Sequence, residues 1–247
     1  MAQRKPKTPP PPRRVQAPKH RQDARQVDPA ARHRQLLYAL SGAGIIALIA
    51  VVAVVALAGK GSSANERKVA SLMAAAGCDF RTGIKIKVPG GKTHIPSLTA
   101  KLPWQTSPPS GGQHYPLWAV WGFYTQTVNP RMVVHNEEHG GVILWWGPQV
   151  PQSTVTALEG LYDSSPTGMF GTPYPALGSK IAITAWTGNP AHYFVNGDFG
   201  TGHIATCPSF DPRVERAFVA FRNAYRGHGP EGIPLADDKP GMGPPTQ

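Results

Sequence analysis

The feature that most constrains this chain is a 24-residue run without a charged side chain, LLYALSGAGIIALIAVVAVVALAG, over residues 36–59. At 1.5 Å per residue, a helix of this length is long enough to cross a hydrocarbon core of about 30 Å. A buried helix of the same length in a globular domain would normally show a polar stripe. The run therefore predicts one transmembrane helix over residues 36–59.

The charge on the two sides of this run predicts its direction. Residues 1–35 hold ten Lys or Arg against two Asp or Glu, which is +8 of the formal net charge of +11. By the positive-inside rule, the N-terminus lies in the cytoplasm and the chain after residue 60 is extracytoplasmic, so the protein is a single-pass protein of the cell membrane. A second interpretation of the apolar run is a signal peptide that is cleaved after Ala58.

The basic N-terminal arm is rich in proline and poor in apolar side chains. It cannot bury enough surface to offset the entropy of ordering, so we expect residues 1–35 to be disordered and to lie near anionic lipid. Because the positive charge is in this arm and not on a folded face with aromatic platforms, no nucleic-acid partner is expected.

About 190 residues follow the apolar run, which is enough for one domain with its own core. We expect a juxtamembrane helix over 60–77, a globular domain over 78–231 and a flexible tail over 232–247. Hydrophobic patterns within the domain predict strands over 83–88, 142–146 and 181–186, and helices over 152–162 and 212–225. Interleaved helices and strands without a regular repeat predict an α+β fold: a small mixed sheet with covering helices.

Two cysteines, Cys78 and Cys207, both follow the apolar run. In an oxidising extracytoplasmic compartment, they predict one intramolecular disulfide. The bridge would close a loop of about 130 residues, worth about 4 to 5 kcal/mol in the chain-entropy model. The alternative is a pair of buried free thiols. Because the chain has no C-x-x-C motif, a thioredoxin-type centre or a thiolate zinc site is not expected.

The densest group of chemically active side chains is the segment HNEEH, from His135 to His139, just before the apolar strand VILWW. Two histidines four residues apart lie on the same side of a helix, where one cation can bind both. The letters also fit the inverted zinc-peptidase pattern H-x-x-E-H, in which Glu138 would activate a metal-bound water. That pattern requires a long helix, whereas Pro130, Gly140 and Gly141 leave room for about two turns.

A Gly-rich loop with the sequence SGGQH places His114 where it could reach this segment. The predicted metal ligands are His114, His135 and His139, with Glu138 as a fourth ligand or as an orienting group, and the predicted ion is one copper or zinc, which both accept imidazole. Alternatively, these side chains only hydrogen-bond to neighbouring loops. The remaining domain histidines are interpreted as surface or structural residues: His94, His192, His203 and His228.

Two segments together resemble a bacterial family known as domain of unknown function 3105. The family's loop, its W-G-x-Y stretch and its H-N-x-E-H-G block match Pro108, Pro109, Ser110, Gly111, His114, Trp121, Gly122, Tyr124, His135, Asn136, Glu138, His139 and Gly140. The resemblance implies a membrane-tethered or secreted extracytoplasmic domain, without an established biochemical role. Glu137 stands where the family usually has an apolar residue, which favours Glu138 as the functional carboxylate.

Three functions are compatible with these observations. The first is an extracytoplasmic metal-binding domain, and the second is a metal-dependent hydrolase with Glu138 as its base. The third is a non-catalytic envelope module that binds a partner protein. The sequence specifies neither a substrate nor an oligomeric state.

Overall fold

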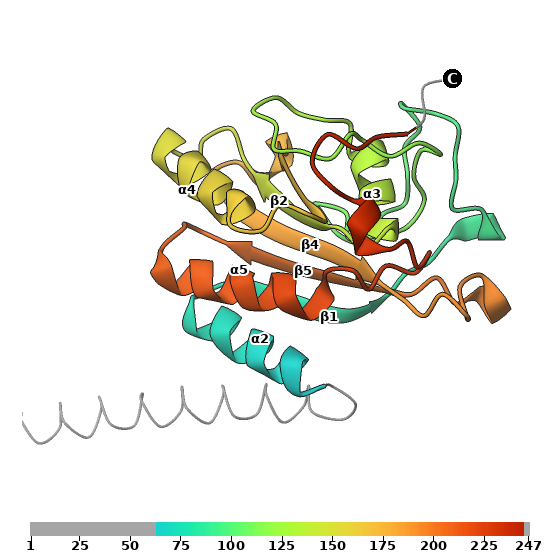
Figure 1. The fold of residues 1–247 in the computed structure, drawn as a ribbon, viewed down its shortest axis with the longest axis horizontal. Helices are drawn as coiled ribbons and strands as arrows, with labels where there is room; N and C mark the ends of the chain where they lie inside the picture. The colour runs from blue at the N-terminus through green and yellow to red at the C-terminus, as the bar shows by residue number, and fades with distance from the viewer. Residues whose placement is uncertain (1–62, 245–247) are drawn as a thin grey trace, which may run out of the picture. The chain divides into compact units, whose positions relative to one another are not determined.

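The structure, a computed structural model, describes residues 63–244 (Figure 1). Its helices and strands are α2 (Ala64–Ala75), β1 (Asp79–Lys85), α3 (Pro130–Glu138), β2 (Val142–Trp146), α4 (Gln152–Asp163), β3 (Met169–Pro173), β4 (Ile181–Thr187), β5 (Thr201–Cys207) and α5 (Pro212–Tyr225). Short 3-10 turns lie at η1 (Pro89–Gly91), η2 (Pro175–Leu177), η3 (Val195–Gly197) and η4 (Leu235–Asp237).

The five strands form one mixed sheet in the order β1-β5-β4-β2-β3. Neighbouring strands are antiparallel except for β2 and β3, which are parallel and are connected through α4. A parallel pair needs such a crossover, whereas the antiparallel pairs do not. The α+β fold with a small mixed sheet and covering helices is therefore confirmed for the described part of the chain.

Strand β2 is buried along its whole length because both faces of the sheet are covered. Val142, Leu144 and Trp146 pack into the core shared with α2, α4 and α5. Ile143 and Trp145 point the opposite way, into a second core that includes Val133 and Trp121. Figure 1 shows α5 and α2 along one side of the strands and α3 on the other. A run of five apolar residues is what such a doubly covered strand requires.

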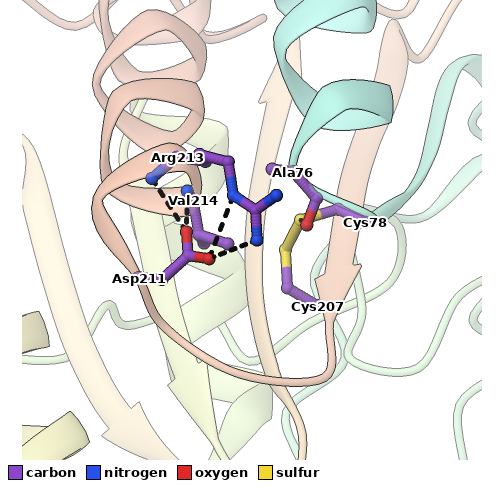
Figure 2. Close-up of a disulfide and its surroundings, with 6 residues drawn as sticks. All are labelled: Ala76, Cys78, Cys207, Asp211, Arg213 and Val214. Atoms are coloured by element: carbon purple, nitrogen blue, oxygen red, sulfur yellow. Dashed lines mark hydrogen bonds and ion pairs between the residues drawn. A yellow bond between two sulfur atoms is a disulfide. The ribbon is translucent and has the colours of Figure 1, made fainter.

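A disulfide joins the start of β1 to the end of β5 (Figure 2). Cys78 follows helix α2, and Cys207 ends β5 before the chain turns into α5. Gly77, at φ +71°, ends α2 and directs the chain into β1, because glycine adopts the left-handed conformation without a Cβ clash. The predicted bridge is thus formed. A disulfide favours an extracytoplasmic location, since disulfides persist in oxidising compartments.

Side chains cap the first turns of the two helices beside the bridge. The side chain of Asp211 caps α5 by accepting hydrogen bonds from the backbone N–H groups of Arg213 and Val214, as Figure 2 shows. Ser63 and Glu66 form a reciprocal capping box at α2. The juxtamembrane helix predicted over 60–77 is observed from Ala64, and residues 60–62 lie outside the described range.

Strand β1 differs from the prediction in its bounds. It covers Asp79–Lys85 and not 83–88, because Gly83 at φ +69° lies in a register shift, and the three residues Asp79–Arg81 before the shift also pair with β5. Ile86 and Val88 leave the sheet and are buried in a separate cluster with Trp186. Strands β3 and β5 were not predicted, since each contains a glycine that weakens the strand pattern.

The C-terminal segment also differs from the expectation of a flexible tail over 232–247. Asp238 is 1% exposed, and its backbone oxygen accepts a hydrogen bond from Gly168. The backbone N–H of Trp121 donates to the oxygen of Met242, and the N–H of Gly241 donates to the oxygen of Trp121. Residues 232–244 are held against the domain because their backbone groups pair with loops that the sequence alone does not bring near.

The regions predicted to be a disordered arm (1–35) and a transmembrane helix (36–59) lie outside the described residues, as do 245–247. Within residues 63–244, no helix is both long enough and apolar enough to cross a membrane.

Candidate metal centre

Helix α3 carries most of the predicted site. Asn129 caps its first turn by accepting from the N–H of Arg131, and Pro130 occupies the first helical position, where its missing N–H costs nothing. The helix has nine residues, and Gly140 at φ +106° follows its C-cap, His139. Its short length agrees with the two turns that the sequence allows.

Three imidazoles converge on one carboxylate oxygen at the end of this helix. The Oε2 atom of Glu138 lies 2.9 Å from Nε2 of His114, 3.3 Å from Nε2 of His94 and 3.8 Å from Nε2 of His135. The three ring centroids are 4.8 to 5.0 Å apart. One ligand atom from each of the four residues lies within 4.8 Å of the others, so the group can hold a metal ion.

Backbone carbonyl groups fix the orientation of two of these rings. His114 donates from Nδ1 to the oxygen of Gly112 at 2.7 Å, and His135 donates from Nδ1 to the oxygen of Tyr115 at 3.0 Å. A carbonyl oxygen only accepts, so Nδ1 carries the proton in each ring and Nε2 of the neutral imidazole presents a lone pair. Metal-binding histidines are oriented in this way.

The pKa values of His135 and Glu138 on α3 are both lowered, but for different reasons. Desolvation lowers the pKa of His135 to about 3, so its imidazole is neutral near pH 7. Burial alone would raise the pKa of Glu138, but its polar contacts with His114, His94 and Tyr193 outweigh burial and hold that pKa below its usual range. The cluster therefore combines an ionised carboxylate with at least one neutral nitrogen ligand.

The contact between Nε2 of His114 and Oε2 of Glu138 is short but does not have the geometry of a hydrogen bond. Both side chains are almost fully buried, and Nε2 of His114 has no well-directed hydrogen-bond partner among the described residues, although Oε2 is near. Two acceptors that face each other repel unless a proton or a cation lies between them. This buried nitrogen is the atom that fits a metal ion best.

The sequence analysis missed two residues of this cluster. His94, interpreted as surface or structural, is brought to Glu138 by an isolated bridge between its backbone and that of His114. Its side chain is 43% exposed, and the hydrogen bond to Glu138 raises its pKa. Tyr193, from the loop after β4, donates its hydroxyl to Oε1 of Glu138. Neither residue lies in a motif, so no sequence signal identifies them.

His139 was predicted in the same set but makes different contacts. Its ring lies 4.9 Å from that of His135. However, its Nδ1 lies 3.4 Å from Asp238 and its Nε2 lies 3.5 Å from Glu231. His135, His139 and Glu231 form a second group with metal-binding spacing. The four predicted ligands are thus divided between two neighbouring groups.

Glu137 stands where the family usually has an apolar residue, and its side chain is fully buried between α3 and the sheet. It accepts a hydrogen bond from Thr184 on β4, whose hydroxyl in turn accepts from the indole N–H of Trp145. Burial raises the pKa of Glu137 well above its usual value. The position faces the sheet and not the histidine cluster, which explains why an apolar residue suits it and why Glu138 is the carboxylate of the site.

These observations describe an α+β domain with one disulfide and a buried histidine and glutamate cluster compatible with a metal ion. Residues 97–232 match the family described as protein of unknown function (DUF3105), and the chain belongs to this family. The matched range includes His114, His135, Glu138, His139 and Glu231. No curated protein and no solved structure was found to match the chain.

Proposed function

We propose that this protein is a membrane-anchored extracytoplasmic domain that binds one transition-metal ion, zinc or copper, through His94, His114, His135 and Glu138. The observation that carries the proposal is the convergence of three Nε2 atoms on one carboxylate oxygen at 2.9 to 3.8 Å. Ligands bound at 2.0 to 2.1 Å around a tetrahedral ion lie about 3.3 Å from each other. The three N–O distances bracket this value, and three nitrogens with one oxygen suit either ion.

The position of Glu138 favours metal binding over hydrolysis. A zinc hydrolase keeps one coordination position for water and uses a separate carboxylate as base. Here Oε2 of Glu138 lies 2.9 to 3.8 Å from the Nε2 atoms of all three rings, which is the separation expected between ligands of one ion. Its Oε1 accepts a hydrogen bond from the hydroxyl of Tyr193. Both oxygens are committed, so Glu138 acts as the fourth ligand.

The test compares Glu138→Gln with Glu137→Gln in the purified full-length chain in detergent. The two variants make the same change at adjacent buried positions, but only one of them faces the imidazoles. With up to one equivalent of Zn²⁺ in competition with a chelator, we expect Glu138→Gln to weaken binding by about 10-fold to 100-fold or more. Glu137→Gln should bind as the wild type does, because this side chain contacts Thr184 on β4 and not the imidazoles.

Two results would overturn this proposal. A wild-type chain that retains no stoichiometric zinc or copper after reconstitution favours the non-catalytic envelope module, in which the histidines only stabilise loops and a partner protein binds elsewhere. Equal zinc affinities of the two glutamine variants would show that the cluster is not the binding site.

A further inference from the structure

A second histidine beside the proposed centre has a carboxylate at each ring nitrogen. Nδ1 of His139 lies 3.4 Å from Oδ1 of Asp238, which is buried. Nε2 lies 3.5 Å from Oε2 of Glu231, whose side chain is 37% exposed. One side of the ring is therefore closed by the protein and the other faces a carboxylate that solvent reaches.

Backbone hydrogen bonds hold Asp238, which carries the buried carboxylate, in place. The N–H of Gly168 donates to the backbone oxygen of Asp238, and the N–H of Asp238 donates to the oxygen of Leu235. A buried carboxylate at Nδ1 keeps the proton on that nitrogen and leaves the lone pair on Nε2, an arrangement found behind metal-bound imidazoles. Nε2 of His139 and the carboxylate of Glu231 are then the two groups free to bind a cation.

The second group is built against the first one. The backbone N–H of Glu231 donates to the oxygen of Glu138 at 3.3 Å, and the Trp118 ring contacts both His135 and His139. Within residues 63–244, the ion-pair partners of Glu138, Glu231 and Asp238 are all histidines, with no lysine or arginine among them. Three carboxylates with only histidines as counter-ions favour a bound cation.

We propose that His139 and Glu231 form a second, solvent-facing site for a divalent transition-metal ion, adjoining the first. This inference rests on the proposed function, because His135 is assumed to give its Nε2 to the first ion. The second ion then has two protein ligands and completes its shell with water. It therefore binds more weakly and exchanges faster than the first.

The test is a Zn²⁺ titration of the full-length apo protein in detergent, followed by calorimetry and by chelator competition. The wild type should bind two equivalents in a tight and a weaker step. Glu231→Gln should weaken the second step by about 10-fold or more and leave the first step unchanged. Glu159→Gln, which removes one exposed carboxylate from α4, is the matched control and should keep both steps. Equal melting temperatures of the two variants would show that both fold.

The outcomes separate the two proposals. A wild type that binds one equivalent, or a second step that survives Glu231→Gln, overturns the second site and leaves the first intact. Loss of both steps in Glu231→Gln means that Glu231 belongs to a single centre, which also overturns the second site. No stoichiometric zinc in the wild type overturns the proposed function itself.

Discussion

At the scale of single residues, His203 shows how a buried imidazole outside the metal centre contributes to stability. Its two ring nitrogens lie 2.8 Å from the hydroxyl oxygens of Thr82 and Thr187, and its ring stacks on Tyr225 with centroids 4.0 Å apart. The prediction of a structural role for this histidine is confirmed. Burial lowers its pKa to about 3.

This depressed pKa predicts a loss of stability in mild acid. An unfolded histidine takes up a proton near pH 6.5, whereas the folded His203 does so only near pH 3. Between these values the unfolded state binds more protons, so the free energy of unfolding falls by up to about 1.4 kcal/mol per pH unit as pH decreases. Urea unfolding of the metal-free protein at pH 6, 5 and 4 should therefore show a steeper loss for the wild type than for His203→Gln.

The slope in His203→Gln should decrease but not vanish, because His135 has a similarly low pKa and acts in the same direction. Parallel pH dependences in the wild type and the variant would contradict the assignment to His203.

At the scale of elements, the disulfide is the covalent link that joins α2 and β1 to the far end of the chain. Its cysteines are 129 positions apart in sequence, and β1 pairs with β5, the strand that Cys207 ends. The bridge thus reinforces a pairing between strands that the chain must bring together over a long loop.

Removing this link should lower the stability of the domain. In the chain-entropy model, a loop of this length predicts a loss of about 4 to 5 kcal/mol in the free energy of unfolding for Cys78→Ser with Cys207→Ser. Urea unfolding followed by tryptophan fluorescence measures the change. A reducing agent should destabilise the wild type and leave the double variant unaffected. A difference below about 1 kcal/mol would mean that the unfolded chain is already compact there.

At the scale of the whole molecule, the apolar run 36–59 predicts that the protein stays in the membrane with its domain outside. We expect alkaline carbonate to leave the full chain in the membrane pellet and to release a variant without residues 36–59, because only the run can span the hydrocarbon. External protease should reach the domain but not a tag at the N-terminus. Release of the wild type as a fragment whose mass corresponds to residues 59–247 would instead support cleavage after Ala58.

Much of the fold could be predicted from local patterns. Strand β2, helices α4 and α5 and the stop at Gly77 were identified because hydrophobic period, capping and turn residues act over a few positions. Strands β3 and β5 were not, since Gly171 and Gly202 interrupt their patterns where side chains of Phe123 and Ser110 approach the backbone. Those close approaches exist only in the folded domain.

The candidate site follows the same division. The segment from His135 to His139 and the loop that carries His114 were identified because they are short segments with unusual composition. By itself the sequence determined the α+β class, the two paired cysteines and the three residues of the cluster that come from motifs. Only the tertiary structure decided that His94 and Tyr193 join them and that His139 belongs with Glu231. These contacts join segments up to about a hundred residues apart, and packing rather than local pattern sets their distances.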